Sequence, residues 1–298
     1  MRVLVLGGSG TVGSQVVRDL LAQGVEVSVL TRDESKASDL PVGVEPRIGD
    51  LREPETVRRV FKGIESLFLL NATSPSESHE GLMALSGARS AEVKRLVYLS
   101  AMDIERAPYI PHFGTKIGVE AAVKKSGIPY TILRPNNFYQ NDYWFKDALL
   151  QFGVYPQPYG EIGMSRVDVR DIADAAVVAL TSDKGDGETF NLIGPEILTG
   201  ETTAAAWGAA LGKEVLHGGN DLDSWEQQAL TRLPDWMVFD FKLMYEYFQT
   251  EGCRGTDEDL ERQFELIGHE PRVYEDFVRE TAAEWSGQFE ERSAGIGS

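Results

Sequence analysis

The chain has 298 residues, of which 42% are hydrophobic and 26% are charged, as expected for a globular protein with a buried core. Its formal net charge of −18 repels phosphate backbones and anionic membranes, and the plain explanation of this charge is a need for solubility. No run approaches the ~20 apolar residues of a membrane span, so we expect a cytoplasmic protein with a small-molecule ligand, and neither nucleic acid nor a membrane as partner.

The first half of the chain alternates short apolar runs with segments of helical periodicity. Strands that are covered on both faces read as nearly continuous apolar runs, as these do. Repeated strand–helix units predict an α/β fold with a doubly wound parallel sheet, the Rossmann architecture. In chain order we expect a strand at 3–6, a helix at 14–23, a strand at 25–30, a helix at 53–61, a strand at 66–70, a helix at 81–91, a strand at 95–100, a helix at 115–126 and a strand at 130–134.

The rhythm changes after about residue 138, where aromatic residues and prolines crowd together. Residues 164–182 then resemble a strand and a helix that return to the first domain, and "ETFNLIG" predicts a further short strand. We expect a Rossmann domain over residues 1–150, joined by 164–182, and a smaller, mainly helical substrate or lid region over residues 151–298.

Cysteine and histidine give no sign of a disulfide or a metal site. The single cysteine, Cys253, excludes an intrachain disulfide. The four histidines are far apart in the sequence, and none shows a metal-ligand spacing. We therefore expect no bound metal.

Four glycines, Gly7, Gly8, Gly10 and Gly13, lie between the first strand and the first helix. They satisfy both G-x-G-x-x-G and G-x-x-G-x-x-G in the strand–helix context typical of dinucleotide binding. Glycine permits the sharp turn and leaves room for a pyrophosphate at the N–H groups of the helix N-terminus. The alternative is a tight turn without a ligand. The expected contacts of the dinucleotide are Gly7, Ser9, Gly10, Thr11, Val12 and Gly13.

The end of the second strand bears on which dinucleotide binds. An acidic residue there usually binds the ribose 2′-hydroxyl of NAD, whereas an arginine accommodates the 2′-phosphate of NADP. Here the chain reads Thr31, Arg32, Asp33, which favours NADPH. Asp33 leaves NADH open, and Arg32 has the alternative role of a solvated loop charge.

Two further loops are expected to line the nucleotide. Asp50 and Leu51 follow a third strand, which lies between the strand at 25–30 and the helix at 53–61. The Asp50 carboxylate can accept a hydrogen bond from the adenine amino group or cap the next helix. Asn71, Ala72 and Thr73 follow the fourth strand, at the point where the strand order of such a sheet reverses.

With these residues in place, the chain resembles the NmrA-like branch of the short-chain dehydrogenase/reductase superfamily. The resemblance implies a Rossmann domain that carries NAD(P) and a smaller region that closes over the nicotinamide. Some members reduce quinones, enones, dyes or related carbonyl and imine substrates, whereas others bind the nucleotide as sensors or co-regulators without turnover. The matching stretches, in order, are "VLGGSGTVGSQVV", "VSVLTRD", "GDLREPETVRRVFKGIESLFLL", "VKRLVYLSA", "HFGTKIGVEAAVKKSGIPYTILRPNNFYQN", "VDVRDIADAAVVAL" and "ETFNLIGPEILT".

The superfamily's Tyr-x-x-x-Lys motif is altered in this chain. The matching segment runs from His112 to Lys116, so the lysine is kept and a histidine replaces the tyrosine. The resemblance implies that Lys116 binds the nicotinamide ribose; the alternative is an exposed lysine in the first turn of a helix. A histidine can donate a proton near neutral pH, so His112 is either a general acid or a structural residue of its loop.

The resemblance also places residues around the nicotinamide and the substrate. Ser100 occupies the place of a catalytic serine, although "SAMD", with Met102, can simply line the pocket. "RPNNFYQN" is implied to run beneath the nicotinamide through Pro135, Asn137 and Phe138. Substrate contacts are then expected from Met102, Tyr139, Tyr143 and Trp144, with core packing as the alternative for the aromatic residues.

These features predict an NADPH-dependent reductase that transfers hydride to a quinone, enone, imine or carbonyl substrate. The lost tyrosine motivates the alternative, a non-catalytic NADP(H)-binding redox sensor that acts through a protein partner. An epimerase or dehydratase is disfavoured, because those enzymes usually keep the tyrosine. The acidic C-terminal region, with a net charge of −8 over residues 251–298, either forms a substrate pocket or makes the subunit contact of a homodimer.

Overall fold

Seven parallel strands form one sheet in the order β3-β2-β1-β4-β5-β6-β8. The computed structural model of the chain describes residues 1–295, and side chains up to residue 287. The order reverses between β1 and β4, as in a Rossmann fold, and confirms the predicted doubly wound α/β architecture. The strands are β1 Arg2–Val5, β2 Glu26–Thr31, β3 Val44–Ile48, β4 Ser66–Leu69, β5 Arg95–Leu99, β6 Tyr130–Pro135 and β8 Thr189–Leu192.

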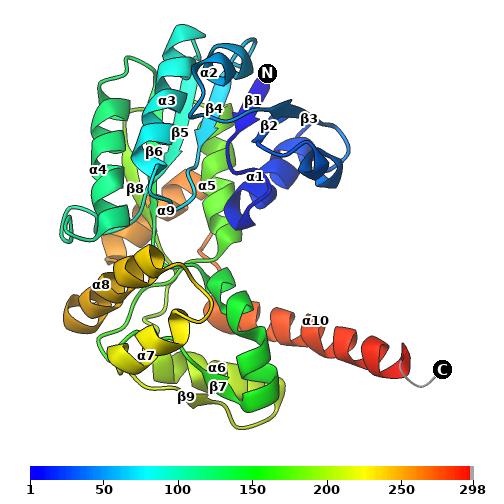
Figure 1. Cartoon of the computed structure of the whole chain (residues 1–298), viewed down its shortest axis with the longest axis vertical. Coiled ribbons are helices and arrows are strands. Elements are labelled where there is room, and N and C mark those ends of the chain that lie inside the picture. Colours follow the sequence, from blue (N-terminus) through cyan, green and yellow to red (C-terminus); the bar gives the residue numbers. More distant parts are fainter. Residues whose placement is uncertain (296–298) are drawn as a thin grey trace. The chain divides into compact units, whose positions relative to one another are not determined.

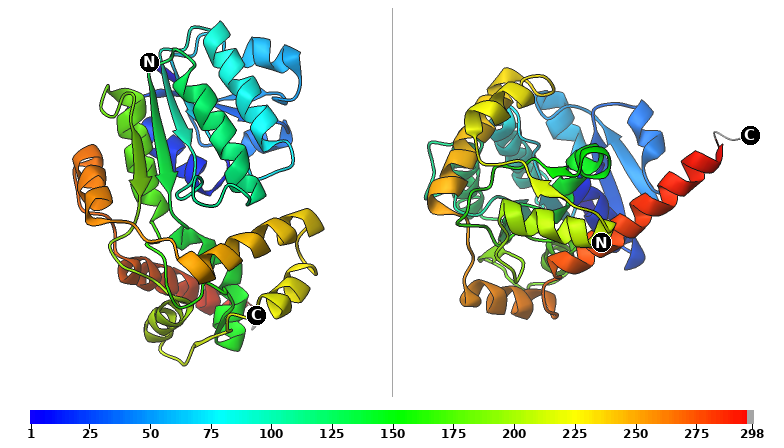
Figure 2. Two further views of the ribbon diagram at one scale, coloured as in Figure 1. Left: turned by 90° about the vertical axis from the view of Figure 1, so that its left-hand side faces the viewer. Right: turned by 90° about the horizontal axis from the view of Figure 1, so that it is seen from below.

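Helices cover both faces of this sheet (Figures 1 and 2). On one face α2 packs beside α3, and α3 beside α4; on the other, α5 packs against both α1 and α9. Both faces are therefore shielded from water at the central strands, which explains their unbroken apolar runs, whereas β3 at the edge of the sheet is partly exposed. The helices are α1 Thr11–Ala22, α2 Pro54–Val60, α3 Glu77–Ser90, α4 Pro111–Lys124, α5 Val169–Thr181 and α9 Asp257–Ile267, with a short 3-10 helix, η1 Ser35–Asp39, after β2.

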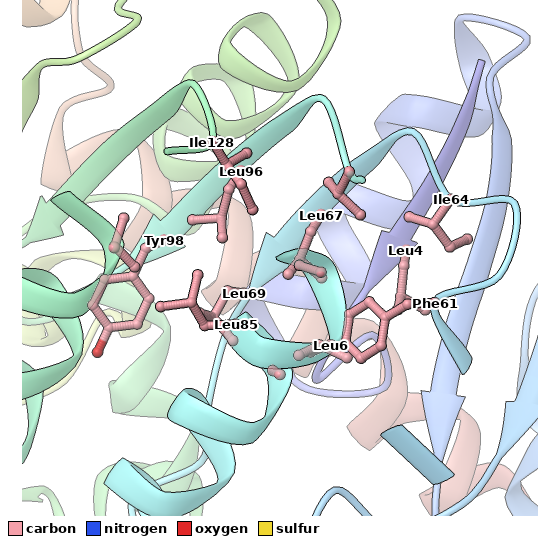
Figure 3. Packing of buried hydrophobic residues seen from close by; sticks show 14 of the residues in the cluster. Leu4, Leu6, Phe61, Ile64, Leu67, Leu69, Leu85, Leu96, Tyr98 and Ile128 are labelled. Carbon is pink, nitrogen blue, oxygen red and sulfur yellow. The ribbon is translucent and has the colours of Figure 1, made fainter. Parts of the chain in front are cut away.

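The core beneath α2 and α3 is built from alternate residues of neighbouring strands (Figure 3). Leu4 of β1, Leu67 of β4 and Leu96 of β5 are fully buried there, and Phe61 after α2 joins them. Successive side chains of a strand point to opposite faces, so every second residue enters this layer. Replacing one of these leucines with alanine would destabilise the fold by about 2–5 kcal/mol.

The chain divides into two compact units. The predicted boundary at residue 150 differs from this division, because the chain leaves the sheet when β6 ends and the aromatic segment belongs to unit 2. Two later segments return to unit 1: the first carries α5 and β8, and the second carries α9. Unit 1 comprises residues 1–136, 169–192 and 257–270; unit 2 comprises residues 137–168, 193–256 and 271–298, the last three of which lie outside the described residues.

Unit 2 is mainly helical and is centred on a buried ion pair. Arg166 donates to the Asp142 carboxylate at 2.8 Å, and both side chains are completely buried. Tyr155, Tyr274 and the Trp207 indole donate to the same carboxylate, so its oxygens are hydrogen-bonded. The elements are η2 Tyr139–Phe145, η3 Ala148–Phe152, β7 Val154–Tyr155, α6 Gly200–Leu211, β9 Leu216–His217, α7 Leu222–Ala229, α8 Asp235–Glu251 and α10 Tyr274–Gly295.

Two helices of unit 1 begin earlier than the sequence predicts. Helix α3 begins at Glu77 instead of residue 81, and α4 begins at Pro111 instead of residue 115. The early start of α4 puts His112 and Lys116 on one helix, a turn apart. No helix in the described part of the chain is both long enough and apolar enough to cross a bilayer.

Candidate functional site

The predicted nucleotide contacts of unit 1 lie in loops at one edge of its sheet. Because all seven strands are parallel, the segments that follow β1 to β6 leave the same edge. Ligands of such sheets bind outside the carboxyl ends of the strands, where the strand order reverses. That position lies between β1 and β4, so the glycine loop and residues 71–73 flank it.

The glycine loop has no room for a side chain at Gly7, Gly8 or Gly13. Gly7 has φ +67°, a conformation that favours glycine, and its carbonyl accepts the N–H of Gly10 at 2.9 Å. A Cβ on Gly13 would lie 2.2 Å from the Gly7 oxygen, and one on Gly8 would lie 2.7 Å from Val29. The turn is therefore pressed against both the sheet and the start of α1.

The N-terminus of α1 suits an anion. Its N-cap residue is Gly10, which has no side chain to occupy the first N–H groups, and its first turn carries no acidic residue. Ser9, Gly10 and Thr11 are exposed, whereas Val12 and Gly13 are buried and would offer only their backbone. An uncapped helix end behind a glycine turn fits a pyrophosphate.

The two charged residues of the loop after β2, Arg32 and Asp33, make different contacts. Asp33 accepts hydrogen bonds from the Ser35 hydroxyl at 2.7 Å and the Ser35 N–H at 2.9 Å, and these bonds lower the pKa of Asp33. Asp33 therefore holds the start of η1. Arg32 is exposed, and its positive charge helps to lower the pKa of Asp50.

Asp50 does not cap the following helix, because the N-cap residue of α2 is Glu53. Its carboxylate accepts the Arg52 N–H at 2.9 Å and the Arg52 Nε at 3.0 Å. Hydrogen bonds from Arg52 lower the pKa of Asp50 to about 2. Leu51 is buried, so the Asp50–Arg52 pair is what this loop presents to solvent. The predicted adenine contact stays a prediction.

Beyond β4, two buried oxygen atoms lack hydrogen-bond partners among the described residues: Asn71 Oδ1 and Glu77 Oε2. The other Glu77 oxygen binds Lys116 Nζ at 2.5 Å. Ala72 is exposed and Thr73 is half-buried. Sequence reasoning missed Glu77, although an acidic residue close behind the fourth strand, at the ligand-binding edge, was a signal that could have found it.

Two titratable side chains near Lys116 have a defined protonation state: Glu120 on α4 and Tyr98 on β5. Burial alone would raise the pKa of Glu120, but hydrogen bonds from Arg134 lower it. Burial also raises the pKa of Tyr98 well above its usual value, with the carboxylates of Glu77 and Glu120 adding to the effect. Glu120 is therefore ionised and Tyr98 neutral at physiological pH.

His112 is almost fully buried and packs edge-on against Phe113, with 4.7 Å between ring centroids. Met102 and Pro135 are joined by a backbone hydrogen bond of 3.1 Å, and Asn136 donates to the Met102 sulfur. The ends of β5 and β6 therefore bring Met102 and Pro135 together in unit 1. Whether His112 is a general acid stays a prediction.

The remaining predicted contacts belong to unit 2. Asn137 and Phe138 are held by Arg166, which donates to Asn137 Oδ1 and to the Phe138 carbonyl. Tyr139 is 0% exposed and donates to the Arg272 carbonyl, a placement that favours core packing. The exposed positions are Tyr143 at 44% and Trp144 at 65%.

A cluster of Asp171, Asp174 and His269 does not follow from any spacing in the sequence. One ligand-type atom of each lies within 4.8 Å of the others. The His269 Nε2 lies 3.0 Å from an Asp174 oxygen, and its Nδ1 lies 2.8 Å from the Glu270 carbonyl. Both neighbours can accept a hydrogen bond from the imidazole ring, so hydrogen bonding accounts for the position of His269.

Comparison with known proteins identifies the family of this chain. The NmrA-like family matches residues 1–277. The NAD(P)H azoreductase of Xenophilus azovorans is 31% identical over 286 residues, which cover 94% of this chain and 98% of that protein. The predicted family resemblance is thereby confirmed.

Two solved structures share the fold. The NADPH-dependent quinone oxidoreductase QOR2 of Escherichia coli, complexed with NADPH, has a TM-score of 0.82 at 22% identity and covers 94% of this chain and 99% of its own. The Citrobacter sp. triphenylmethane reductase, complexed with NADP(H), has a TM-score of 0.81 at 24% identity and covers 95% and 100%. At these sequence identities, the structural similarity shows a shared fold alone.

Proposed function

Because the chain belongs to the NmrA-like family, we propose that it is an NADPH-dependent oxidoreductase that reduces a small unsaturated molecule. The candidate substrates are quinones, enones, imines and carbonyl compounds, to which the names of the relatives add azo and triphenylmethane dyes. Relatives named for NAD(P)H or solved with NADPH support both the cofactor and the oxidoreductase class.

The observation that carries this proposal is the geometry of the glycine loop. The Gly7 oxygen lies 2.2 Å from where a Cβ on Gly13 would be, and helix α1 begins without a side-chain cap. A turn that only connects a strand to a helix does not require both features. Together they allow a pyrophosphate to approach the N–H groups of α1. The fit supports a dinucleotide in unit 1.

A preference for NADPH over NADH is supported by the loop after β2. One carboxylate oxygen of Asp33 is engaged by the N–H and the hydroxyl of Ser35. Arg32 is exposed and offers a planar cation that suits the 2′-phosphate.

When bound, NADPH supplies a hydride from C4 of its nicotinamide. In our proposal, Lys116 of α4 would hold the nicotinamide ribose of the bound cofactor. The proton that completes the reduction comes from His112 or from water. The variant His112→Asn separates these sources, because asparagine offers a polar side chain at the start of α4 but cannot deliver a proton.

The proposal is tested by following NADPH consumption with a panel of quinones, enones, imines, azo dyes and triphenylmethane dyes, with product identification. We expect turnover with at least one class, and NADPH to be used in preference to NADH. Omitting either the protein or the acceptor gives the background rate. Tight NADPH binding without turnover across the panel would favour the redox sensor, and no binding at all would refute both functions.

A further inference from the structure

Glu77 and Lys116 form a buried ion pair at the ligand-binding edge of unit 1. Lys116 Nζ lies 2.5 Å from Glu77 Oε1, and the two side chains are 10% and 2% exposed. Glu77 lies at the start of α3 and Lys116 in the second turn of α4, and these helices pack side by side. The pair therefore ties together two helices that begin at the same edge of the sheet.

Burial of this ion pair costs free energy that an apolar contact between the two helices would not cost. Two charges lose their hydration on burial, and an apolar pair of similar size is often at least as stabilising. The second oxygen, Glu77 Oε2, is buried without a hydrogen-bond partner, which adds a further penalty. Unsatisfied buried groups of this kind point to a role other than stability.

We propose that Glu77 is a positioning residue that keeps Lys116 charged and directed for binding the ribose of the cofactor. This inference rests on the proposed function. Glu77 Oε2 is itself buried, so Glu77 acts through Lys116 and does not contact the nucleotide. One of the three Lys116 donors is used by Glu77, which leaves the others for the ribose hydroxyls.

The other charged and titratable groups nearby do not replace Glu77. Glu120, one turn beyond Lys116 on α4, is bound by Arg134 of β6 at 2.6 and 2.8 Å and by Lys124. Tyr98 of β5 is neutral, because burial raises its pKa. His112, one turn before Lys116, adds no negative charge. Among the described residues, Glu77 is the counter-ion of Lys116.

The test is the dissociation constant of NADPH, measured by its fluorescence between about pH 6 and about pH 9. In the wild type we expect an affinity nearly independent of pH. In Glu77→Gln the lysine lacks its counter-charge and, being buried, loses its proton more easily as the pH rises. We expect affinity close to wild type near pH 6 and about tenfold weaker binding near pH 9.

Three further variants separate positioning from general damage. Glu77→Asp keeps the charge but shortens the side chain, so it should bind NADPH more weakly than the wild type and still show a flat pH profile. In a Lys116→Met background, Glu77→Gln should have no additional effect on NADPH binding. Glu55→Gln removes an exposed carboxylate of α2 and should match the wild type.

A pH-independent affinity in Glu77→Gln, or equal losses with and without Lys116, would overturn the inference while leaving the proposed function standing. Failure of the wild type to bind NADPH would instead overturn both. If Glu77→Gln does not fold, Glu77→Asp decides: weaker binding with a flat pH profile supports the role, and unchanged binding refutes it.

Discussion

A single methyl group at residue 13 tests the cofactor loop most sharply. In Gly13→Ala the new Cβ would lie 2.2 Å from the Gly7 oxygen, 2.7 Å from the Gly7 carbonyl carbon and 2.9 Å from the Gly8 Cα. All three atoms belong to the backbone, so no side chain can rotate away. The turn itself must move.

The size of the effect follows from that displacement. Relief of the contact with the Gly7 oxygen requires a shift of about 1 Å, since non-bonded carbon and oxygen atoms stay more than about 3 Å apart. A misplacement of about 1 Å at a binding group weakens its function by up to about a hundredfold. Overpacking of this kind also destabilises a fold by about 1–3 kcal/mol.

The assay is NADPH binding by fluorescence, with thermal unfolding measured in parallel. Gly118→Ala in α4 is the matched control, because a Cβ there meets nothing within 4 Å and alanine favours the helix. We expect Gly13→Ala to lose most of its affinity and Gly118→Ala to keep it. Wild-type affinity and stability in Gly13→Ala would refute the account of the loop.

Three further variants probe other parts of the molecule. Arg32→Ser should weaken NADPH binding about tenfold and change NADH binding little, as calorimetric titration of both nucleotides would show; equal losses would remove Arg32 from the phosphate site. The lowered pKa of Asp50 means that its stabilising effect is present above about pH 4 and is lost as the pH falls towards about 2. The urea-unfolding difference between the wild type and Asp50→Asn should therefore shrink over that range, and a constant difference would contradict this. Arg166→Met leaves Asp142 buried without its cation and should cost about 3–5 kcal/mol in urea unfolding, whereas Arg58→Met at an exposed pair should cost under about 1 kcal/mol; similar losses would show that burial does not set the energy.

The features that sequence predicts well here are those with local causes. Most strands of unit 1 are short apolar runs between turns, whereas β3, which reads VEPRI, carries no such signal. The glycines mark the loop after β1 because only glycine fits that backbone. Parallel order then follows from the alternation of strands with helices. The fold and the position of the glycine loop are therefore predictable from the sequence alone.

What sequence could not supply depends on distant partners. Glu77 meets Lys116 only because α3 and α4 pack together, 39 residues apart in the chain. Arg166 and Asp142 look like ordinary surface charges in the sequence, yet tyrosines from distant segments enclose them. Of the two returns to unit 1, the sequence analysis expects one near residues 164–182, but it gives no sign of the return that carries α9.

The early starts of α3 and α4 have a local explanation in the sequence. Pro111 occupies the first turn of α4, where its missing N–H is not needed, and Glu77 and Glu80 favour the N-terminus of α3. Both signals extend the helices towards the ligand-binding edge. Together with the apolar spacing, they account for the placement of His112 on the same helix as Lys116.

The most direct test of the central claim is a single turnover that traces the hydride. The protein is loaded with NADPH deuterated at both hydrogens of nicotinamide C4 and mixed anaerobically with the best acceptor of the panel that forms a new carbon–hydrogen bond. We predict the loss of one equivalent of reduced nicotinamide and one deuterium on carbon in the product, with Gly13→Ala giving little of either. Product formed without deuterium, or nicotinamide that stays reduced with every acceptor, would contradict the account.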